Sequence, residues 1–393
     1  MLGHKFLLFI KSIKGFIKRR ISGNATFFLS RDKPFRKKKR LTATAFAIGV
    51  SSMKKFMLCL LTSFLTLAGF AQKDPFVGFY QGEIAGAKGY PLGNFPDLFA
   101  EVYKGSNGYR LKLISQIMAR AEPHTIVDAL SAENGEIALK DAGNFKLNGK
   151  ITPQKIEADL TYNGKPAKIS LKRMNIVPPT LGKKPPIGAI VLFDGKDLSA
   201  FERVQGEGPA HWEIKDGAMV VTGGGKDKNG KNLNGTLRTK QAFDAVRLHL
   251  EFKIPAEYDV ARTQGRGNSG VIFGPYEVQV LDSFGAPGNW DECGSIYRMH
   301  PPYVNASLEP EAWQTYDIEY HPAKFDGDTL VEFPRFTVYL NGVLVQKDTP
   351  AYSCTSIGPR NFAKFKHPRN GVQLNLQDHT NKVAYRNIWV QPL

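Results

Sequence analysis

Short runs of alternating apolar and polar residues, separated by turn-forming pairs, occupy most of this chain and limit the folds that it can adopt. Asn-Gly or Asp-Gly pairs between such runs are typical of tight β-hairpins. The pairs are Asn107-Gly108, Asn134-Gly135, Asn148-Gly149, Asn163-Gly164, Asp216-Gly217 and Asn341-Gly342. No long helical pattern occurs, and the 38 glycines and 24 prolines also favour turns. The sequence therefore predicts an all-β protein.

A proline-rich segment, residues 177–187, divides the β-rich part of the chain into two domains. Its prolines can continue neither a helix nor a central strand, so we expect an extended linker. Before it, residues 74–176 predict a small antiparallel β domain, either a meander or a small barrel. After it, residues 188–393 contain roughly eleven or twelve strand-like runs, which indicates a two-sheet sandwich or jelly roll.

Residues 53–71 have the features of a secretory signal peptide. Two lysines follow Met53, an apolar run extends from Phe56 to Leu67, and small residues end at Ala71. This run is too short for a comfortable membrane span. We expect translation to start at Met53, which leaves residues 1–52 outside the native protein; the alternative is a basic amphipathic arm before an uncleaved anchor. The mature protein is expected to be periplasmic or secreted, with no membrane span.

The formal charge of +17 belongs mostly to this leader. Residues 1–55 hold 15 basic side chains and one acidic one, so the rest of the chain has 38 and 35, a net charge of +3 by subtraction. The basic surface of a nucleic-acid-binding protein is therefore absent, and no nucleic-acid partner is expected. Two cysteines, Cys293 and Cys354, follow the leader. In an oxidising compartment they could form a disulfide or remain as two buried thiols.

Standard nucleotide and metal motifs are missing from the sequence. The glycines Gly265, Gly267 and Gly270 match the spacing of a dinucleotide-binding fingerprint. They precede a predicted strand and do not open a helix, so they do not predict a nucleotide site.

Two polar segments carry the candidate site residues. In the predicted strand 276–281, Glu277 and Gln279 share one face, with valines on the other. In the segment 373–379, four polar residues alternate onto one face: Gln373, Asn375, Gln377 and His379. Such a row can both donate and accept hydrogen bonds, as sugar hydroxyls require. The alternative is a solvated outer face without a ligand.

Several motifs of the second domain recur in an order that resembles the 3-keto-disaccharide hydrolase family, whose fold is a concanavalin-like jelly-roll β-sandwich. The resemblance covers about residues 188–393 and leaves residues 74–176 outside. The motifs are Leu192–Leu198, Trp212 with Asp216-Gly217, Asn268–Gly270, Tyr276–Asp282, Gly294 with Tyr297, Leu340–Gly342, Leu376-Gln377 with His379, and Tyr385–Trp389.

The resemblance implies cleavage of a glycosidic bond in a 3-keto-glucoside or 3-keto-disaccharide, a small carbohydrate substrate. A ketone at C3 acidifies the proton on C2, so a base can form an enolate and the group on C1 can then leave. Addition of water completes a net hydrolysis. This route needs a base, a group that stabilises the enolate and an acid for the leaving oxygen.

The candidate residues for these roles come from the motifs. Glu277 and His379 are the proton-transfer pair, without assignment of base and acid, and Arg266 is the candidate that neutralises the enolate, a role also open to Arg386. The residues expected to bind substrate hydroxyls are Asn268, Gln279, Tyr297, Asn375, Gln377 and Arg386. The sequence requires no cofactor, but a divalent metal ion could be held by Glu277, Asp282 and His379.

Two other functions remain open at this stage. The spacing of Glu277, Gln279 and Asp282 is similar to the Glu-x-Asp-x-x-Glu strand of laminarinase-type retaining glycosidases, with glutamine in place of the middle acid. A non-catalytic lectin or carbohydrate-binding module would use the same polar face.

Overall fold

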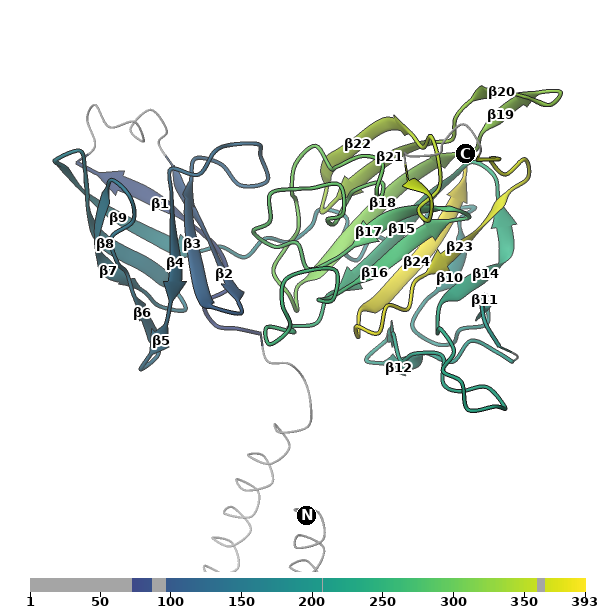
Figure 1. Cartoon of the computed structure of the whole chain (residues 1–393), viewed down its shortest axis with the longest axis horizontal. Helices are drawn as coiled ribbons and strands as arrows, with labels where there is room; N and C mark the ends of the chain where they lie inside the picture. The colour runs from purple at the N-terminus through teal and green to yellow at the C-terminus, as the bar shows by residue number, and fades with distance from the viewer. Residues whose placement is uncertain (1–72, 87–96, 207, 359–364) are drawn as a thin grey trace, which may run out of the picture. The chain divides into compact units, whose positions relative to one another are not determined.

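The computed structural model describes residues 73–86, 97–206, 208–358 and 365–393 (Figure 1). All of them belong to one compact unit, which extends from residue 71 to the C-terminus. The predicted extension, 1–52, and the predicted signal peptide, 53–71, lie outside the described residues and stay predictions. Within the described part, no helix is long and apolar enough to cross a membrane.

The first domain is a single antiparallel sheet with the strand order β4-β3-β2-β1-β9-β8-β7-β6-β5. The strands are β1 (Gly78–Ala85), β2 (Leu98–Gly105), β3 (Gly108–Ile114), β4 (Thr125–Leu130), β5 (Ala132–Glu133), β6 (Glu136–Ala138), β7 (Phe145–Ile151), β8 (Lys155–Tyr162) and β9 (Lys165–Arg173). The two edge strands, β4 and β5, are separated in sequence only by Ser131. The chain therefore runs directly from one edge of the sheet to the other, which brings the two edges together. The domain is thus the small barrel of the two predicted forms.

Two of the four Asn-Gly pairs in this domain, Asn134-Gly135 and Asn163-Gly164, form the expected two-residue hairpin turns, whereas Asn107 lies in a turn and Gly108 begins β3. At Asn134 and Gly135, for example, φ is 51° and 80°, the left-handed values of a two-residue β-turn. The fourth pair, Asn148-Gly149, lies inside β7 and is not a turn. Gly149 is needed there for close strand approach, because a Cβ atom would lie 2.1 Å from the carbonyl oxygen of Glu157.

The second domain contains an eight-stranded and a five-stranded antiparallel sheet. The first has the order β12-β13-β24-β15-β18-β21-β22, with β10 also paired to β24; the second has the order β11-β14-β23-β16-β17. The strands are β10 (Ile190–Phe193), β11 (Phe201–Arg203), β12 (Glu213–Lys215), β13 (Ala218–Val220), β14 (Leu237–Phe243), β15 (Val246–Lys253), β16 (Ser269–Phe273), β17 (Tyr276–Val280), β18 (Trp313–His321), β21 (Arg335–Leu340), β22 (Val343–Pro350), β23 (Val372–Leu376) and β24 (Ala384–Pro392). A separate ribbon pairs β19 (Lys324–Asp326) with β20 (Thr329–Glu332).

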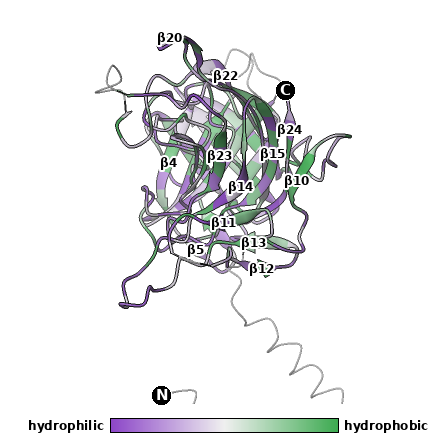
Figure 2. Ribbon diagram, turned by 90° about the vertical axis from the view of Figure 1, so that its right-hand side faces the viewer, coloured by the Kyte–Doolittle hydropathy of each residue, from purple (hydrophilic) through white to green (hydrophobic). Residues whose placement is uncertain are grey.

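Apolar side chains of both sheets meet in one core, which confirms the predicted jelly-roll sandwich. From the five-stranded sheet, Val278, Val280, Leu374 and Leu376 enter this core. Hydrophobic and hydrophilic residues alternate along the sandwich strands (Figure 2). Because side chains alternate along a strand, the polar residues between these apolar ones lie on the opposite face of the sheet.

The two cysteines of the described chain are free and buried. The thiol of Cys293 lies 3.2 Å from the hydroxyl of Tyr316 inside the sandwich. Of the two alternatives that the sequence leaves open, the structure has the buried thiols.

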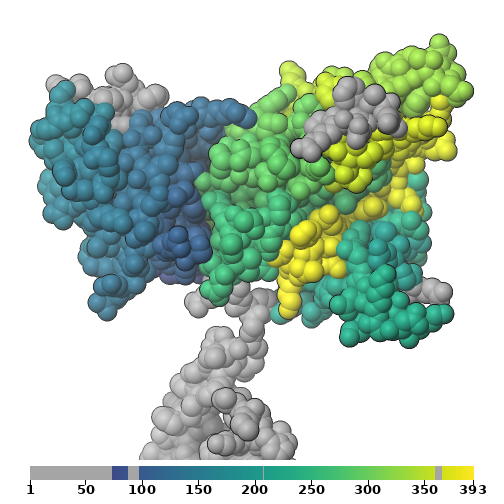
Figure 3. All heavy atoms as spheres, in the orientation of Figure 1, coloured from purple at the N-terminus to yellow at the C-terminus, as the bar shows by residue number. Residues whose placement is uncertain are grey.

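The barrel and the sandwich share a packed boundary (Figure 3). Phe284 and Leu308 of the second domain belong to the hydrophobic core of the first. The rings of Phe79 and Phe284 meet edge to face, with centroids 5.0 Å apart. This apolar contact joins the two domains within the compact unit.

The proline-rich linker binds to the eight-stranded sheet through polar contacts. Thr180 donates to Asp317 Oδ2 at 2.7 Å, and the backbone N–H of Gly182 donates to Glu251 Oε1 at 2.6 Å. Arg386 donates to the other oxygen of Glu251 at 2.6 Å. Burial alone raises the pKa of Glu251, but the imidazole of His249, 3.9 Å from Glu251 Oε1, and the hydrogen bonds from other neighbours outweigh it and lower that pKa to about 2.

We predict that Glu251→Gln lowers the free energy of unfolding by roughly 3 kcal/mol at pH 7. The ordinary pKa of the side chain is 4.5 and its folded value is lower. The stabilisation is therefore complete above pH 4.5 and disappears as the pH falls through 2. Denaturant unfolding at several pH values measures it, with Glu319→Gln of the more exposed Arg247 pair as the control. A loss that is unchanged down to pH 2 would contradict this origin.

Candidate active site

The polar residues predicted on two strands lie on one face of the five-stranded sheet. Glu277 of β17 stands opposite Ile272 of β16, Ile272 opposite Asn375 of β23, and Asn375 opposite Arg238 of β14. Directly opposite residues of neighbouring strands point to the same side of a sheet. The row therefore crosses four strands on the face turned away from the core.

Glu277 is a buried carboxylate without a compensating partner. Its side chain is 3% exposed, and none of its contacts with other described residues is a hydrogen bond or an ion pair. Burial raises its pKa to about 7. The carboxylate lies over Gly270 of β16, where an added Cβ atom would be 2.4 Å from Glu277 Oε1. The missing side chain of Gly270 thus provides the space for Glu277.

Two amides beside this carboxylate are unsatisfied. Asn375 Oδ1 and Gln377 Oε1 are buried and have no hydrogen-bond partner among the residues that the structure describes. The backbone of Gln377 donates to Gly270 O at 3.0 Å, so this residue continues β23 beside the glycine under Glu277. Buried acceptors without partners are costly, and a ligand with hydroxyl groups would satisfy them.

Tyr297 and Trp290 form the border of the polar face near Glu277. The backbone N–H of Tyr297 donates to Glu277 O at 2.9 Å. Burial raises the pKa of the Tyr297 hydroxyl, and the nearby carboxylates of Glu277 and Asp291 raise it further. Trp290 is 51% exposed, and its ring centroid is 6.0 Å from that of Tyr297. An exposed aromatic ring beside polar groups can stack on the apolar face of a sugar.

Gln279 and Asn268 are joined to a loop by hydrogen bonds. Gln279 Nε2 and Asn268 Nδ2 each lie 3.0 Å from Gln264 Oε1. Gln264 in turn donates to the carbonyl oxygen of Asp291 at 2.8 Å. Gln279 shares the face of Glu277, and this network fixes the loop at the end of that face.

The structure places Arg266 and Asp282 in a different role from the predicted one. Arg266 Nε lies 2.6 Å from Asp282 Oδ2, and both side chains are buried. The guanidinium also donates to Lys104 O of the first domain, at 3.3 Å. The pair therefore supports the boundary between the two domains, because its hydrogen-bonding groups are already used there.

The predicted metal ligands do not come together. Asp282 is bound to Arg266, and β17 already ends at Val280. Among the described residues, no group of three or more His, Cys, Asp and Glu side chains is arranged to hold a metal ion. The set Glu277, Asp282 and His379 thus does not fit a metal, and no step below uses one.

His379 does not extend the polar row by strand alternation. β23 ends at Leu376, and His379 lies in the following turn, beside Thr380 with φ of 76°. Its side chain is exposed. Asp378, which immediately precedes His379, is buried and accepts a hydrogen bond from Gly235 N at 2.7 Å. The chain turns there because it is held by Asp378, so the period of two is lost.

Arg386 lies on the other sheet. It belongs to β24, pairs with Glu251 of β15, and its guanidinium is 3.9 Å from the ring centroid of Trp313. Its predicted substrate contact is replaced by this ion pair beside the linker. Arg238, which the sequence reasoning did not consider, shares the polar face with Asn375, but it too is paired with an acid, Glu202, at 2.8 Å.

The missed residues have different sequence signals. Gly270 belongs to the motif Asn268–Gly270, but its place under Glu277 follows only from the pairing of β16 with β17. The place of Arg238 follows only from the register of β14 and β23. Trp290 stands in a loop, where a single exposed tryptophan carries no periodic signal. All three depend on contacts between segments distant in sequence.

A buried carboxylate and unsatisfied amides on a β-sandwich face define a site of the kind found in carbohydrate-active enzymes. Residues 188–391 match the model of the 3-keto-alpha-glucoside-1,2-lyase-like domain. The match spans more than half of the chain, which therefore belongs to this family and has a function of the glycoside hydrolase type. A search of curated proteins found no match.

Solved structures with similarity include two proposed glycosyl hydrolases of Parabacteroides distasonis ATCC 8503. One is 35% identical over 53% of this chain and 86% of that chain, with a TM-score of 0.46. The other is 20% identical over 52% of this chain and 94% of that chain, with a TM-score of 0.39. The alginate lyase Aly36B is 10% identical over 52% and 97% of the two chains, with a TM-score of 0.30.

We predict that Glu277→Gln stabilises the protein relative to the wild type as the pH rises. The difference between the two free energies of unfolding should be roughly 3 kcal/mol more favourable to the variant at pH 8 than at pH 4. The folded pKa of about 7 exceeds the ordinary 4.5, so the folded wild type must lose a proton from a buried group as the pH rises through this window. Denaturant unfolding of both proteins from pH 4 to pH 8 tests this. Parallel pH curves would show that Glu277 is well solvated.

Proposed function

We propose that this protein cleaves the glycosidic bond of 3-keto-glycosides, including 3-keto-disaccharides, by elimination followed by hydration. The supporting observation is a buried, unpaired Glu277 with a pKa of about 7, beside amides that lack partners. The family match supports the same substrate class. The secretory features of residues 53–71 add that the protein acts in the periplasm or outside the cell.

Glu277 serves as the base in this proposal. A general base works best when its pKa is near the working pH, and burial brings Glu277 into that range. It removes the proton from C2, and the electron pair forms the enolate of the C3 ketone. The enolate then expels the oxygen on C1, which gives a C1=C2 double bond. Water next adds its hydroxyl to C1 and a proton to C2.

Tyr297 is assigned the proton donation to the leaving oxygen. Burial and the charge of Glu277 both raise its pKa, so the hydroxyl stays protonated near neutral pH. The backbone hydrogen bond from Tyr297 N to Glu277 O, at 2.9 Å, supports this assignment. His379 is exposed in the segment after β23. The side-chain amides of Asn375 and Gln377 are assigned the binding of substrate hydroxyl groups, which would donate to their free oxygen atoms.

A laminarinase-like mechanism has less support. It requires a second carboxylate facing the first across the scissile bond. The spacing offers Asp282 for this role, but its carboxylate is paired with Arg266 at 2.6 Å. Of the two acids in this segment, only Glu277 is therefore left for the reaction. A single carboxylate suits proton abstraction better than a two-carboxylate displacement.

We predict that the wild-type protein releases the aglycone from a 3-keto-glucoside and leaves the parent glucoside intact. Its kcat/KM should rise about tenfold per pH unit up to about pH 7 and then level off, because Glu277 must be ionised. Glu277→Gln should lose at least about 10²-fold in kcat. Release from both substrates would favour ordinary hydrolysis, and binding without turnover would favour a lectin.

We predict that Gly270→Ala disables the site without unfolding the protein. The new methyl group would displace the flexible end of Glu277, while the backbone at Gly270 needs no left-handed φ. Misplacement of about 1 Å costs on the order of 10² in rate, whereas the melting temperature should change little. The control is Gly105→Ala, whose Cβ would meet nothing closer than 3.9 Å. Full activity of Gly270→Ala would refute the position assigned to the carboxylate.

A further inference from the structure

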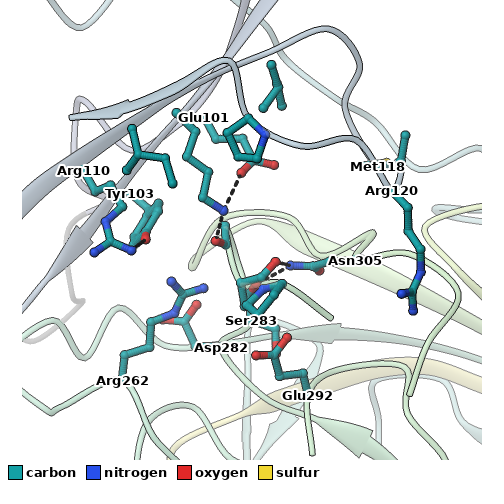
Figure 4. Close-up of a pocket in the computed structure, with 18 of the residues that line it drawn as sticks. Glu101, Tyr103, Arg110, Met118, Arg120, Arg262, Asp282, Ser283, Glu292 and Asn305 are labelled. Carbon is teal, nitrogen blue, oxygen red and sulfur yellow. Dashed lines mark hydrogen bonds and ion pairs between the residues drawn. The ribbon is translucent and has the colours of Figure 1, made fainter. Parts of the chain in front are cut away.

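A cavity of about 710 Å³ lies at the boundary between the barrel and the sandwich (Figure 4). Its size is that of a small-molecule binding site. The barrel contributes Tyr103 of β2 and Lys112 of β3, and the sandwich contributes Arg262, Gln264 and Asp291 from its loops. Glu277 is not part of its wall, so the cavity is separate from the carboxylate of the candidate active site.

The walls of this cavity are fixed by contacts between the domains. Lys112 donates a hydrogen bond to Gly285 O, and Arg120 donates to Pro302 O at 2.9 Å. The buried ring of Phe284 packs against Phe79 beneath them. The barrel therefore holds its side of the cavity in place through both polar and apolar contacts.

The cavity and the polar face meet at Gln264 and Asp291. Gln264 lines the cavity, and its Oε1 accepts a hydrogen bond from Gln279 of the polar face at 3.0 Å. Gln279 is two residues from Glu277 on the same face of β17, a spacing of about 7 Å. Asp291 also lines the cavity, and its charge raises the pKa of Tyr297, which burial and Glu277 raise as well.

The cavity offers hydrogen-bond donors that are not used by the protein. Figure 4 shows the guanidinium of Arg262 directed towards Tyr103, whose ring centroid is 4.6 Å away. Arg262 donates to Phe284 O, but no carboxylate of the described residues lies within ion-pair distance of it. Its other N–H groups are free for oxygen atoms of a ligand.

The charges of the cavity are mixed and mostly balanced. Lys112 lies 3.5 Å from Glu101, and Glu292 accepts hydrogen bonds from the backbone of Gly288 and Asn289. Such a lining selects neither a strong anion nor a strong cation. The guanidinium groups of this lining donate hydrogen bonds and the carboxylates accept them. Together with an aromatic ring, they suit a neutral molecule with several hydroxyl groups.

We propose that this cavity binds the leaving sugar of a disaccharide whose 3-keto ring lies over Glu277. The barrel domain, which lies outside the family match at residues 188–391, thereby completes the substrate site. The proposal rests on the proposed function for the reaction, but its binding test does not. In this arrangement Arg262 and Lys112 determine which leaving group is accepted, and Glu277 carries out the proton transfer.

The kinetic test compares two substrates that differ only in the leaving group, a 3-keto-glucosyl-glucose and methyl 3-keto-glucoside. Arg262→Met removes the free donors, and Ala119→Trp fills the cavity from the barrel side. Each variant should lower kcat/KM at least tenfold for the disaccharide and less than twofold for the methyl glycoside. Arg335→Met, which removes an exposed arginine paired with Asp348 on β22, should change neither. Equal losses on both substrates, or no loss on either, would overturn the proposal.

A binding test separates this proposal from the proposed function. Calorimetric titration of Glu277→Gln with the same 3-keto-disaccharide should give a Kd at least tenfold lower than that of Glu277→Gln with Arg262→Met. This result would support the sugar site even if the wild-type protein cleaved neither substrate. Absence of binding, or a Kd that Arg262→Met and Ala119→Trp leave unchanged, would overturn it.

Discussion

The packing of the two sandwich sheets determines where the chemistry of this protein can occur. Val278, Val280 and their neighbours on β23 must enter the core, so the intervening residues of the same strands face the other way. Glu277 has no freedom to turn back, because its strand is fixed on both sides of it. Its burial then follows from the loop that carries Tyr297, whose backbone is bound to Glu277 O at 2.9 Å.

Three buried carboxylates of this protein show how structural and functional acids differ. Glu251 accepts hydrogen bonds from three groups, and Asp282 is paired with Arg266, so both charges are compensated. Within the described part of the chain Glu277 has neither kind of partner, and burial raises its pKa to about 7. An uncompensated buried acid weakens the fold at neutral pH, and such groups concentrate at functional sites. Glu277 therefore differs from Glu251 and Asp282 in having no compensating partner among the described residues.

The sequence predicted those features that depend on local periodicity. The sandwich, the antiparallel strands of the first domain, and the shared face of Glu277 with Gln279 all follow from alternation with a period of two, whereas the choice between a meander and a barrel stayed open. The errors begin where a strand ends. His379 lies beyond β23. The polar residues of 373–379 alternate regularly in the sequence, but the strand ends before His379, where Asp378 holds a turn by a hydrogen bond. Such ends depend on tertiary hydrogen bonds, which periodicity does not report.

The arginines illustrate the second limit of sequence reasoning, because a long charged side chain is placed by its partner. Arg266 is paired with the buried Asp282, and Arg386 with the buried Glu251. Both distances are 2.6 Å. Arg262, four residues before Arg266, has no such acid and stacks on Tyr103 of the barrel. The difference arises from the fold, which brings Asp282 to one guanidinium and an open cavity to the other. An arginine that lines a cavity and has no acidic partner is thus the better candidate for ligand binding. Because Arg262 contacts Tyr103 of the barrel, its use in ligand binding would make the barrel part of the substrate site.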